Sequence, residues 1–245
     1  MRYDFLAIGD TTTDAFIRIK EASVHCDVNR ERCEICMKFA DKIPYEDVFV
    51  IPAVGNSANA AIAAARLGLK SALVANVGSD FHGKECINVF KKEGVGTKFV
   101  QVHKDIKTNY HYVLWYEDDR TILVKHEKYA YTLPKIGEPK WIYLSSMGGD
   151  ADNLYPIIGD YLKIHPTVKL AFQPGTYQMK LGVEKLRDIY ARTELFFCNK
   201  EEAQRILNTE EEDMKKLLSG MRGLGPKMVI ITDGPKGAYA DDGST

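Results

Sequence analysis

Polar and acidic residues follow a series of short apolar runs in this chain, at the points where the strands of a sheet would end. Carboxylates accept hydrogen bonds and amides both accept and donate them, so together they suit a ligand with several hydroxyl groups. Glycines at the same points let the backbone approach a ligand closely. The combination predicts a site for a polyhydroxylated substrate and a metal-bound phosphate. The residues concerned are Asp10, Asp14, Gly55, Asn56, Asn59, Ser145, Ser146, Gln173, Asn199, Glu202, Thr232, Gly234 and Gly237.

One group of these residues opens an alanine-rich helix. The stretch GNSANAA carries Gly55, Asn56 and Asn59, where the unpaired N–H groups of a helix start also point outward. Amide side chains in this position suit sugar hydroxyls. The alternative is that Asn56 or Ser57 only caps the helix, which is a common role for these residue types.

The elements that position these residues alternate between strands and helices. Strands are expected at YDFLAIGD, KSALVANVG, WIYLSS, KLAFQP, ELFFCN and MVIITD, and helices at NSANAAIAAARLG, at GKECINVFKKEG, near 154–164, near 183–192, from Glu201 and at 211–224. Apolar, β-branched and aromatic strands separated by helices predict an α/β fold with a parallel central sheet flanked by helices on both faces. Ligands bind at the carboxyl ends of the strands in such sheets, which is where the polar residues fall.

Two segments do not fit this alternation. The stretch KTNYHYVLWYEDDRTILVKHEKYAY has a period of two and many aromatics, which predicts a hairpin with Asp118 and Asp119 in its turn. Tyr112 lies on one side of this hairpin and His111 on the other. The stretch from Ile17 to Val50 is irregular and charged. We expect a single domain over residues 1–245, with a small β-sheet lid formed by residues 15–52 and 98–132.

The order and spacing of several motifs resemble the ribokinase-like, or PfkB, family of sugar and nucleoside kinases. GSDFHG is similar to the family's G-x-D-x-x-G, NKEEA to its N-x-x-E, and ITDGPKGAYA to the stretch that approaches ATP. The opening IGDTTTD resembles the family's first strand, and the likeness extends from Tyr3 to Gly243. The first signature of the family is matched in order and spacing by Gly55, Asn59, Ala61, Gly68 and Gly78.

The resemblance implies a ribokinase-like fold and ATP-dependent phosphorylation of a hydroxyl on a small sugar or related polyol, with Mg²⁺. Glu202 would act on Mg²⁺ through water. The lid would close over the acceptor and exclude water. Acceptor contacts are expected from Asp14, Gly55, Asn56, Asn59, Tyr112 and Gln173. Nucleotide contacts are expected from Asn199, Glu202, Thr232, Gly234 and Gly237.

The chain departs from the family pattern at two places. Val54 replaces the first glycine of the signature pair, and Ser57 replaces a smaller residue or proline. The second signature, G-A-G-D, occurs nowhere in residues 1–245, although its aspartate serves the family as the catalytic base and its backbone forms an anion hole. We expect that aspartate beyond Thr245, together with the partner strand of a hairpin that GAYADDG begins. The 245 residues alone are therefore expected to be inactive.

Other interpretations of the same residues remain open. Within enzymes, a nucleoside kinase is the alternative, because Tyr110, Tyr112 and Trp115 could stack on a base or line a sugar face. Outside enzymes, the missing aspartate favours a non-catalytic relative that binds a sugar or nucleoside. Glu202 could be an ordinary first-turn helix residue and Asp14 a turn residue. The aromatic hairpin could be a dimer interface, and the resemblance implies a homodimer through the lid.

Composition narrows the class of partner. The net charge of −1 does not suggest a polyanionic partner, since a nucleic-acid-binding protein usually carries a basic patch or stripe. No apolar run is long enough to span a bilayer, and the first residues show no signal-peptide pattern. These features predict a cytoplasmic protein with a small-molecule substrate.

Three of the five cysteines lie close together in HCDVNRERCEIC. Cys33 and Cys36 have the C-x-x-C spacing of zinc sites and redox dithiols. A four-ligand site would also need Cys26 and a further group such as His25. The alternative is that all three are reduced thiols on a surface loop.

Overall fold

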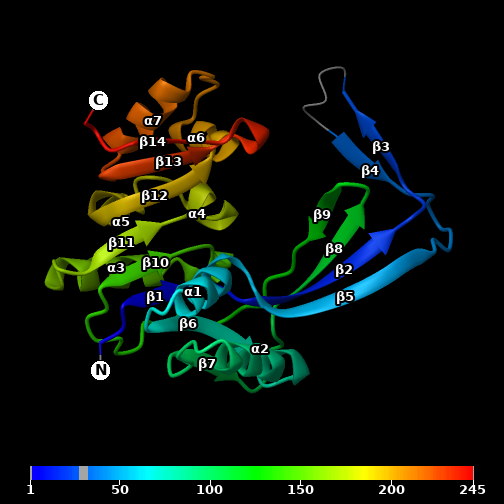
Figure 1. The fold of residues 1–245 in the computed structure, drawn as a ribbon, viewed down its shortest axis with the longest axis horizontal. Helices are drawn as coiled ribbons and strands as arrows, with labels where there is room; N and C mark the ends of the chain where they lie inside the picture. The colour runs from blue at the N-terminus through cyan, green and yellow to red at the C-terminus, as the bar shows by residue number, and fades with distance from the viewer. Residues whose placement is uncertain (1, 28–32, 245) are drawn as a thin grey trace.

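A central eight-stranded sheet organises the molecule (Figure 1). A computed structural model describes residues 2–27 and 33–244. The strand order is β14-β13-β12-β11-β10-β1-β6-β7, and every neighbouring pair is parallel except β13 with β14. The strands are β1 (Phe5–Ile8), β6 (Ser71–Gly78), β7 (Val100–His103), β10 (Trp141–Leu144), β11 (Lys169–Phe172), β12 (Thr193–Asn199), β13 (Met228–Thr232) and β14 (Ala238–Asp241).

Helices cover the two faces of this sheet, as the alternating pattern predicts. Every residue of β6 is buried, which is expected of a parallel strand covered on both faces. Side chains of α1 and α2 share one buried cluster, and those of α3 and α5 to α7 share the other. The helices are α1 (Asn56–Arg66), α2 (Phe81–Lys92), α3 (Leu154–Ile164), α4 (Thr176–Leu181), α5 (Arg187–Arg192), α6 (Lys200–Leu207) and α7 (Met214–Gly223), with short 3₁₀ turns at Gly149–Ala151 and Gly234–Lys236.

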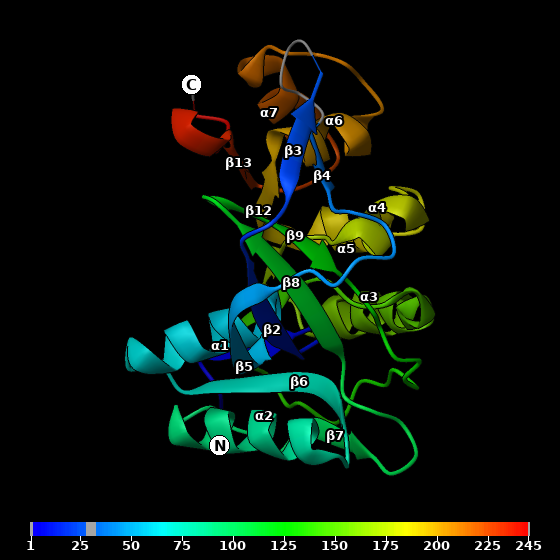
Figure 2. The same ribbon diagram turned by 90° about the vertical axis from the view of Figure 1, so that its right-hand side faces the viewer.

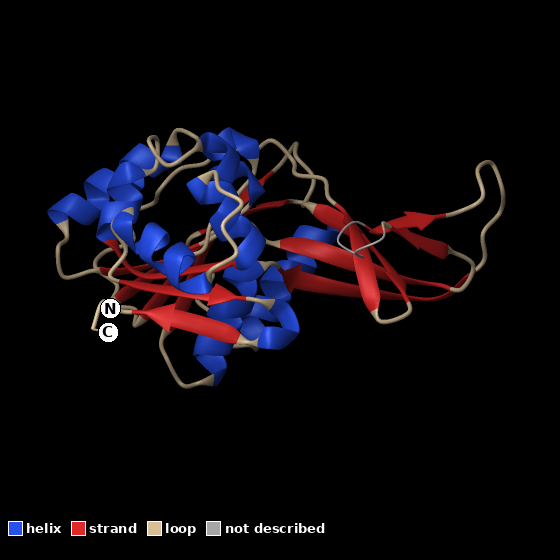
Figure 3. Ribbon diagram, turned by 90° about the horizontal axis from the view of Figure 1, so that it is seen from above, coloured by secondary structure: helices blue, strands red, loops and turns tan. Residues whose placement is uncertain are grey.

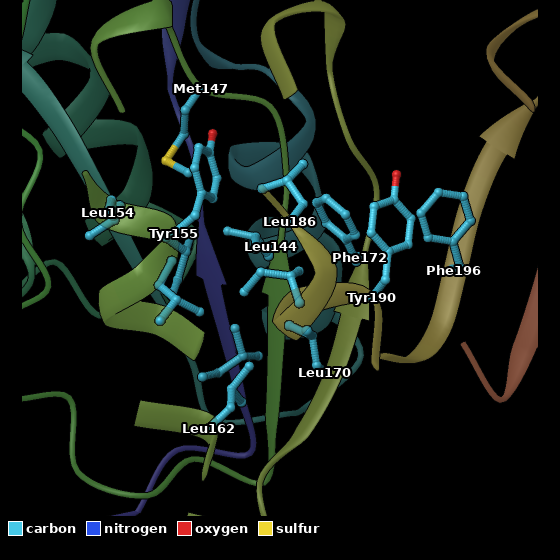
Figure 4. Close-up of a cluster of buried hydrophobic side chains, with 14 of the residues drawn as sticks. Leu144, Met147, Leu154, Tyr155, Leu162, Leu170, Phe172, Leu186, Tyr190 and Phe196 are labelled. Carbon is cyan, nitrogen blue, oxygen red and sulfur yellow. The ribbon is translucent and has the colours of Figure 1, made fainter. Parts of the chain in front are cut away.

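The larger buried cluster holds the middle of the sheet to its helices (Figure 4). Phe172 of β11, Tyr190 of α5 and Phe196 of β12 pack with ring centroids 5.5 to 5.7 Å apart, within the range of favourable aromatic pairs. Leu144 and Leu170 extend this contact along the same face. The cluster gives the strand ends a rigid base.

A separate four-stranded sheet, here named the side sheet, projects from the central sheet (Figures 2 and 3). Its order is β5-β2-β8-β9, formed by β2 (Thr12–Ile19), β5 (Tyr45–Val54), β8 (Tyr110–Tyr116) and β9 (Asp119–Leu123). A two-stranded hairpin, β3 (Ser23–Cys26) with β4 (Cys33–Cys36), lies at its far end. The stretch from Ile17 to Val50 is therefore mostly strand where it is described. Its charged residues hid this pattern, because β3, half of β4 and much of β5 are exposed.

The GSDFHG motif fixes the chain where it enters the side sheet. Asp80 accepts hydrogen bonds from the backbone N–H of Gly83, the N–H of Thr108 and the hydroxyl of Thr108, at 2.9, 3.0 and 2.6 Å. A Cβ on Gly83 would lie 2.0 Å from the carbonyl oxygen of Gly78, and a Cβ on Gly78 would lie 2.4 Å from the carbonyl oxygen of Ile106. Both glycines are required by close backbone contact, so the motif acts here as a structural anchor for the segment that leads into β8.

The cysteines near the hairpin do not follow the C-x-x-C interpretation. Cys26 forms a disulfide with Cys33, across β3 and β4, and Cys36 is a free thiol. The prediction of three reduced thiols is therefore wrong for two of them. No group of three or more His, Cys, Asp or Glu side chains among the described residues could hold a metal ion. Residues 28–32 of this stretch lie outside the described residues.

Several other elements differ from the expectation. The predicted lid segment 98–132 includes the whole of β7, which pairs with β6 in the central sheet. Helix α4 was not predicted, and the turn of the aromatic hairpin is Glu117 and Asp118, since Asp119 already pairs with Tyr116. Strand β14 pairs with β13 and is an edge strand of the central sheet, so among the described residues no strand lies on its other side. The further partner strand of GAYADDG stays a prediction. None of the described helices is long and apolar enough to cross a membrane.

Candidate active site

Five parallel strands end at one edge of the central sheet, and most of the predicted site residues follow them. We name this edge the rim. It comprises the residues directly after β1, β10, β11, β12 and β13, together with the side chains grouped at its β1 end, Asp14, His111, His126 and Tyr131. Parallel pairing in register brings these ends side by side. The side sheet begins at the rim, because β1 is followed almost directly by β2.

Asp14 lies on β2 and faces His111 on β8. The two strands pair in parallel with Asp14 opposite His111, and opposite residues share a sheet face. Asp14 Oδ1 lies 3.5 Å from His111 Nδ1, and the two side chains are 16% and 13% exposed. Within the described residues, Asp14 Oδ1 and His111 Nε2 are buried without a hydrogen-bond partner. Leaving buried polar atoms unsatisfied is costly, so the pair is suited to an external ligand.

Asp10 is the second carboxylate of the rim, and its hydrogen bonds are satisfied. Its oxygens accept from the hydroxyl of Tyr131 at 2.8 and 2.9 Å, from the N–H of Gly148 at 2.8 Å, and from His126 Nδ1 at 3.2 Å. Burial and the charge of Asp10 raise the pKa of Tyr131, which keeps its hydroxyl protonated as a donor. Asp10 therefore ties the segment after β9 to the ends of β1 and β10.

Gly55 brings the start of α1 against the chain after β1. Its φ is +110°, and a Cβ there would lie 3.0 Å from the carbonyl oxygen of Asp10, so glycine is needed. Ser57 donates from its hydroxyl to the same carbonyl at 2.7 Å. No side chain caps α1, since the N-cap is Gly55. The capping interpretation of Asn56 and Ser57 is therefore wrong.

The other predicted acceptor residues are spread over different surfaces. Asn56 is exposed at the first turn of α1. Asn59 lines a shallow hollow between β5, α1 and α2. Tyr112 is 49% exposed on the face of the side sheet opposite Asp14, where its ring lies 5.2 Å from that of Tyr110. Gln173, directly after β11, accepts a hydrogen bond from the hydroxyl of Tyr143. Of these four, only Tyr112 is placed relative to Asp14, on the opposite face of the side sheet.

At the β12 end of the rim, Asn199 and Glu202 satisfy each other. The side chain of Asn199 accepts from the N–H of Glu202 at 2.7 Å, and the carboxylate of Glu202 accepts from the N–H of Asn199 at 2.9 Å. This is a capping box at the start of α6. Glu202 therefore has the structural role of a first-turn helix residue, since it caps the start of α6.

At the β13 end, the glycine turn is open to solvent. Thr232, Gly234 and Gly237 are exposed. Gly234 and Gly237 have φ values of +49° and +98° with no atom within 4 Å of a Cβ position. The turn is closed by a hydrogen bond of 2.8 Å from the N–H of Asp233 to the carbonyl of Gly237. An exposed backbone of this kind is accessible to a ligand.

The polar hollow beside this turn and next to α6 carries charged side chains of both signs, with three cationic and four acidic residues: Lys200, Arg205, Lys236, Glu201, Glu210, Glu212 and Asp233. A hydrogen bond with Glu212 raises the pKa of Lys200, so its ammonium is charged at neutral pH. The described residues hold no cluster of three metal-ligating side chains. Mg²⁺ commonly uses one or two carboxylates with waters and phosphates, which is compatible with this arrangement.

The sequence alone did not identify His111, His126 or Tyr131 as rim residues. Their place depends on the parallel pairing of β2 with β8 and on the return of the chain after β9. Neither the register of β2 with β8 nor the path of the chain after β9 can be predicted from a local sequence pattern. The alternation of the hairpin did separate His111 from Tyr112, which was the available clue.

Comparisons with known proteins agree with this architecture. Residues 21–245 match the sequence profile described as pfkB family carbohydrate kinase. The chain is 26% identical over 197 residues to the nucleoside kinase of Methanothermobacter thermautotrophicus, covering 77% of this chain and 61% of that protein. It is 30% identical over 197 residues to the cytidine kinase of Thermococcus kodakarensis, covering 78% of this chain and 68% of that protein.

Solved structures share the fold. The fructokinase of Halothermothrix orenii superposes with a TM-score of 0.74 at 22% identity, covering 99% of this chain and 84% of that chain. The α/β architecture with a mostly parallel central sheet is thus that of ribokinase-like proteins, as the motifs predicted. The chain belongs to the pfkB family of carbohydrate kinases. It spans about three fifths of the length of the nucleoside kinase that it matches.

Proposed function

We propose that this protein is an ATP-dependent kinase that phosphorylates a hydroxyl of a small sugar or related polyol. The observation that carries the proposal is the buried, unpartnered Oδ1 of Asp14 at the rim, within the described residues. A carboxylate oxygen accepts hydrogen bonds only, so a ligand hydroxyl that donates to it would remove the cost of its burial. Membership of the pfkB family supports the same reaction class.

Asp14 would hold the acceptor, and the start of α1 would lie next to it. Gly55 packs against the carbonyl of Asp10, which keeps backbone close to the rim. Among the amide side chains predicted to contact the acceptor, Asn56 and Gln173 lie closest in sequence to a strand end. Asn56 follows β5 and Gln173 follows β11. Positioning of this kind is the main contribution a protein makes to phosphoryl transfer.

The nucleotide would lie along the exposed turn from Thr232 to Gly237, next to Lys200 and Lys236. Lys200 and Lys236 pair with Glu212 and Asp233 in the unbound protein, so they would exchange these carboxylates for phosphate oxygens. Asn199 would approach the same region. When bound, Mg²⁺ supplies neutralisation of the phosphate oxygens that face the acceptor. Glu202 would approach that ion through water while keeping its hydrogen bond to the N–H of Asn199.

The side sheet would be the lid, composed of parts of residues 15–52 and 98–132. Its faces carry many exposed apolar side chains, which mark interaction surfaces. We propose that a second copy of the chain covers part of this surface in a homodimer, and that the protein is cytoplasmic. Gel filtration with light scattering tests the dimer. The exposed residues are Tyr45, Val48, Phe49, Val50, Ile51, Tyr112, Ile122 and Leu123.

The proposal assigns no proton acceptor within residues 1–245. The attacking hydroxyl must lose its proton to a base, and the G-A-G-D sequence expected to supply one is absent from these residues. We therefore expect residues 1–245 expressed alone to bind an acceptor without transferring phosphate. Phosphate transfer by these 245 residues would contradict this assignment.

A nucleoside acceptor is the second candidate. Tyr177 of α4 is 42% exposed, and its ring lies edge-on to His126 at 5.5 Å. His126 is bonded to Asp10, so an accessible aromatic face lies near the rim. An aromatic side chain in this place could stack on a base, whereas Tyr112 is directed to the opposite face of the side sheet.

A screen of phosphate acceptors tests the function and separates these candidates. The complete gene product would be incubated with ATP, Mg²⁺ and single acceptors, and ADP release would be measured. D-ribose and D-fructose represent sugars, and cytidine and adenosine represent nucleosides. ADP release above background with one of these classes would support the corresponding kinase. Binding of an acceptor without ADP release would support the non-catalytic relative, and neither binding nor release would overturn the proposal.

A further inference from the structure

The hairpin at the far end of the side sheet is closed by a disulfide to which the proposed function gives no role (Figure 1). The bond joins Cys26 of β3 to Cys33 of β4 at directly opposite positions, and both cysteines are exposed. An exposed disulfide is accessible to an external thiol and is easily reduced. Disulfides are rare in the reducing cytoplasm, the proposed location of this protein, unless they are redox-active.

Little else holds this hairpin together. Within the described residues, β3 and β4 pair with each other and with no further strand. All of β3 and half of β4 are exposed, and no described residue of either strand belongs to a buried hydrophobic cluster. An isolated two-stranded hairpin is marginally stable at best in water. Because a disulfide restricts the unfolded chain, this bond contributes much of what keeps β3 and β4 paired.

One face of the hairpin borders the turn between β8 and β9. Side chains alternate along a strand, so the register places Val24, Cys33 and Ile35 on the same face. These three side chains line a hollow of about 380 Å³, and Leu114 and Tyr116 of β8 line it from the other side. A paired hairpin therefore covers this end of β8, and a hairpin that loses its pairing uncovers it.

We propose that Cys26 and Cys33 form a reversible redox switch that sets the order of the β3–β4 hairpin, and that its reduction weakens acceptor binding. In the oxidised protein the hairpin stays paired and covers the end of β8. In the reduced protein the strands separate and the hollow opens. The other end of β8 carries His111 next to Asp14, so the hairpin and the acceptor end share this strand. The effect on acceptor binding rests on the proposed function, whereas the change in the hairpin does not.

The electron donor for the reduction is a dithiol carrier. A thiolate of the carrier attacks one sulfur of the Cys26–Cys33 bond and forms a mixed disulfide, and the other cysteine sulfur leaves as a thiolate and takes up a proton. The second thiol of the carrier loses its proton and attacks the mixed disulfide. The protein thereby gains two electrons and two protons, and the carrier is left as an internal disulfide. Cys36 takes no part, because it lies on the opposite face of β4 from Cys33.

The test measures amide hydrogen exchange in the complete gene product, purified without thiols or chelators and then equilibrated with oxidised or reduced dithiothreitol. Differential alkylation with mass spectrometry reports the state of Cys26 and Cys33, and bound zinc is measured before equilibration. The double variant Cys26→Ser with Cys33→Ser removes the bond. Cys36→Ser is the matched control, because it removes the free thiol of the same strand. D-ribose and cytidine are the acceptor probes, and calorimetry gives their Kd in both redox states.

Reduction should loosen the hairpin and leave the central sheet unchanged. In the wild type and in Cys36→Ser, the amides of β3 and β4 should exchange about tenfold faster or more after reduction, and those of β6 should not change. The double variant should exchange at the faster rate in both conditions. A probe that binds should bind the reduced protein and the double variant about fivefold more weakly than the oxidised protein.

The switch and the proposed function fail in different ways. Equal exchange in the two redox states, or a double variant that still responds to reduction, would overturn the switch. Cysteines isolated as thiols with a bound zinc ion would also overturn it, because the group would then be a metal site. If exchange changes but a probe binds both states equally, the hairpin switch stands and its effect on the acceptor is overturned. If neither probe binds in either state, that effect fails together with the proposed function, and exchange still decides the hairpin switch.

Discussion

At the β1 end of the rim, Asp14 and His111 hold buried polar atoms that no other described group satisfies, whereas at the β12 end Asn199 and Glu202 satisfy each other. We name these the acceptor end and the nucleotide end, following the proposed function. The acceptor end is enclosed by two strands of the side sheet. The nucleotide end is an exposed turn beside a polar hollow.

The difference indicates how each end would bind its ligand. A buried group without a partner has already lost its water, so a ligand hydroxyl that reaches it replaces nothing. The exposed turn keeps its backbone hydrated and must exchange water for phosphate oxygens. The acceptor end should therefore depend strongly on a few side chains and on their support. The nucleotide end should tolerate single side-chain changes better, because backbone groups supply much of the contact.

A change in the GSDFHG motif, which anchors the chain that leads into β8, should have the largest effect on the stability of the acceptor end. Gly83→Ala would place a Cβ 2.0 Å from the carbonyl oxygen of Gly78, so backbone must shift where the chain leads into β8. We expect a loss of about 3 kcal/mol in the free energy of unfolding, measured by urea denaturation. Gly223→Ala is the matched control, since it is also helical and its Cβ would meet no atom within 4 Å. Equal stability of the two variants would contradict the role of the GSDFHG motif as a structural anchor.

Removing the charge of Asp14 should affect activity almost as strongly. Asp14→Asn keeps the shape and weakens the hydrogen bond to the acceptor hydroxyl. We expect kcat/KM to fall about 100-fold, equivalent to about 2.7 kcal/mol, with the fold retained. Asp47→Asn, an exposed residue on β5 of the same side sheet, should keep wild-type kinetics. A similar decrease in both variants would show that the effect does not come from acceptor binding.

At the nucleotide end, the substitution Glu202→Gln tests whether the charge of Glu202 contributes to Mg²⁺ binding. Glu202→Gln preserves a capping box, since Gln serves the same position, but removes the charge. We expect stability within about 0.5 kcal/mol of wild type and about a tenfold rise in the Mg²⁺ concentration for half-maximal activity. Glu201→Gln, its neighbour on α6, is the control. An unchanged Mg²⁺ requirement would restrict Glu202 to its helical role.

The smallest predicted effect depends on pH and concerns Asp80. Burial raises its pKa, but hydrogen bonds from Thr108 and Gly83 outweigh this, so the pKa lies below the ordinary value of 3.8. A lowered pKa means that the stabilisation is present above 3.8 and is lost as the pH falls through the folded-state value. Asp80→Ala should lose about 1 kcal/mol at pH 7, as for other helix caps.

The difference between Asp80→Ala and wild type should shrink below about pH 4. Unfolding midpoints measured between about pH 7 and about pH 3 would show this convergence. Asp119→Ala, whose side chain is 93% exposed beside the hairpin turn, should parallel wild type throughout. A constant difference for Asp80→Ala across this range would mean that its charge has no part in the anchor.

The contrast between the two ends also explains how much the sequence predicts. Most of the central sheet was predictable because strands such as β6 and β12 are short apolar runs and because helix starts and stops are local, whereas β7 was assigned to the lid. The motif GSDFHG was visible too, although its role in anchoring the side sheet depends on a contact with Thr108, 28 residues beyond Asp80. Local patterns therefore identify elements and motifs well.

Side-chain groupings were harder to predict, because they depend on which strands pair. Asp14 was identified, but its neighbour His111 follows only from the parallel pairing of β2 with β8. Tyr112 was assigned to the acceptor on aromatic character, and the pairing directs it to the opposite face. The disulfide of Cys26 with Cys33 likewise depends on the β3–β4 register. The pairing of β2 with β8 is a long-range register that residue spacing does not contain, whereas the disulfide depends on the register of a local hairpin between residues seven apart.

The most direct test of the account is acceptor binding in the absence of nucleotide. D-ribose, D-fructose and cytidine would be titrated calorimetrically into the complete gene product and into its Asp14→Asn variant. The account predicts that at least one of them binds the wild type and that the variant binds it at least about tenfold more weakly. Binding of equal strength to both proteins would contradict the central role of Asp14 and the preformed acceptor end.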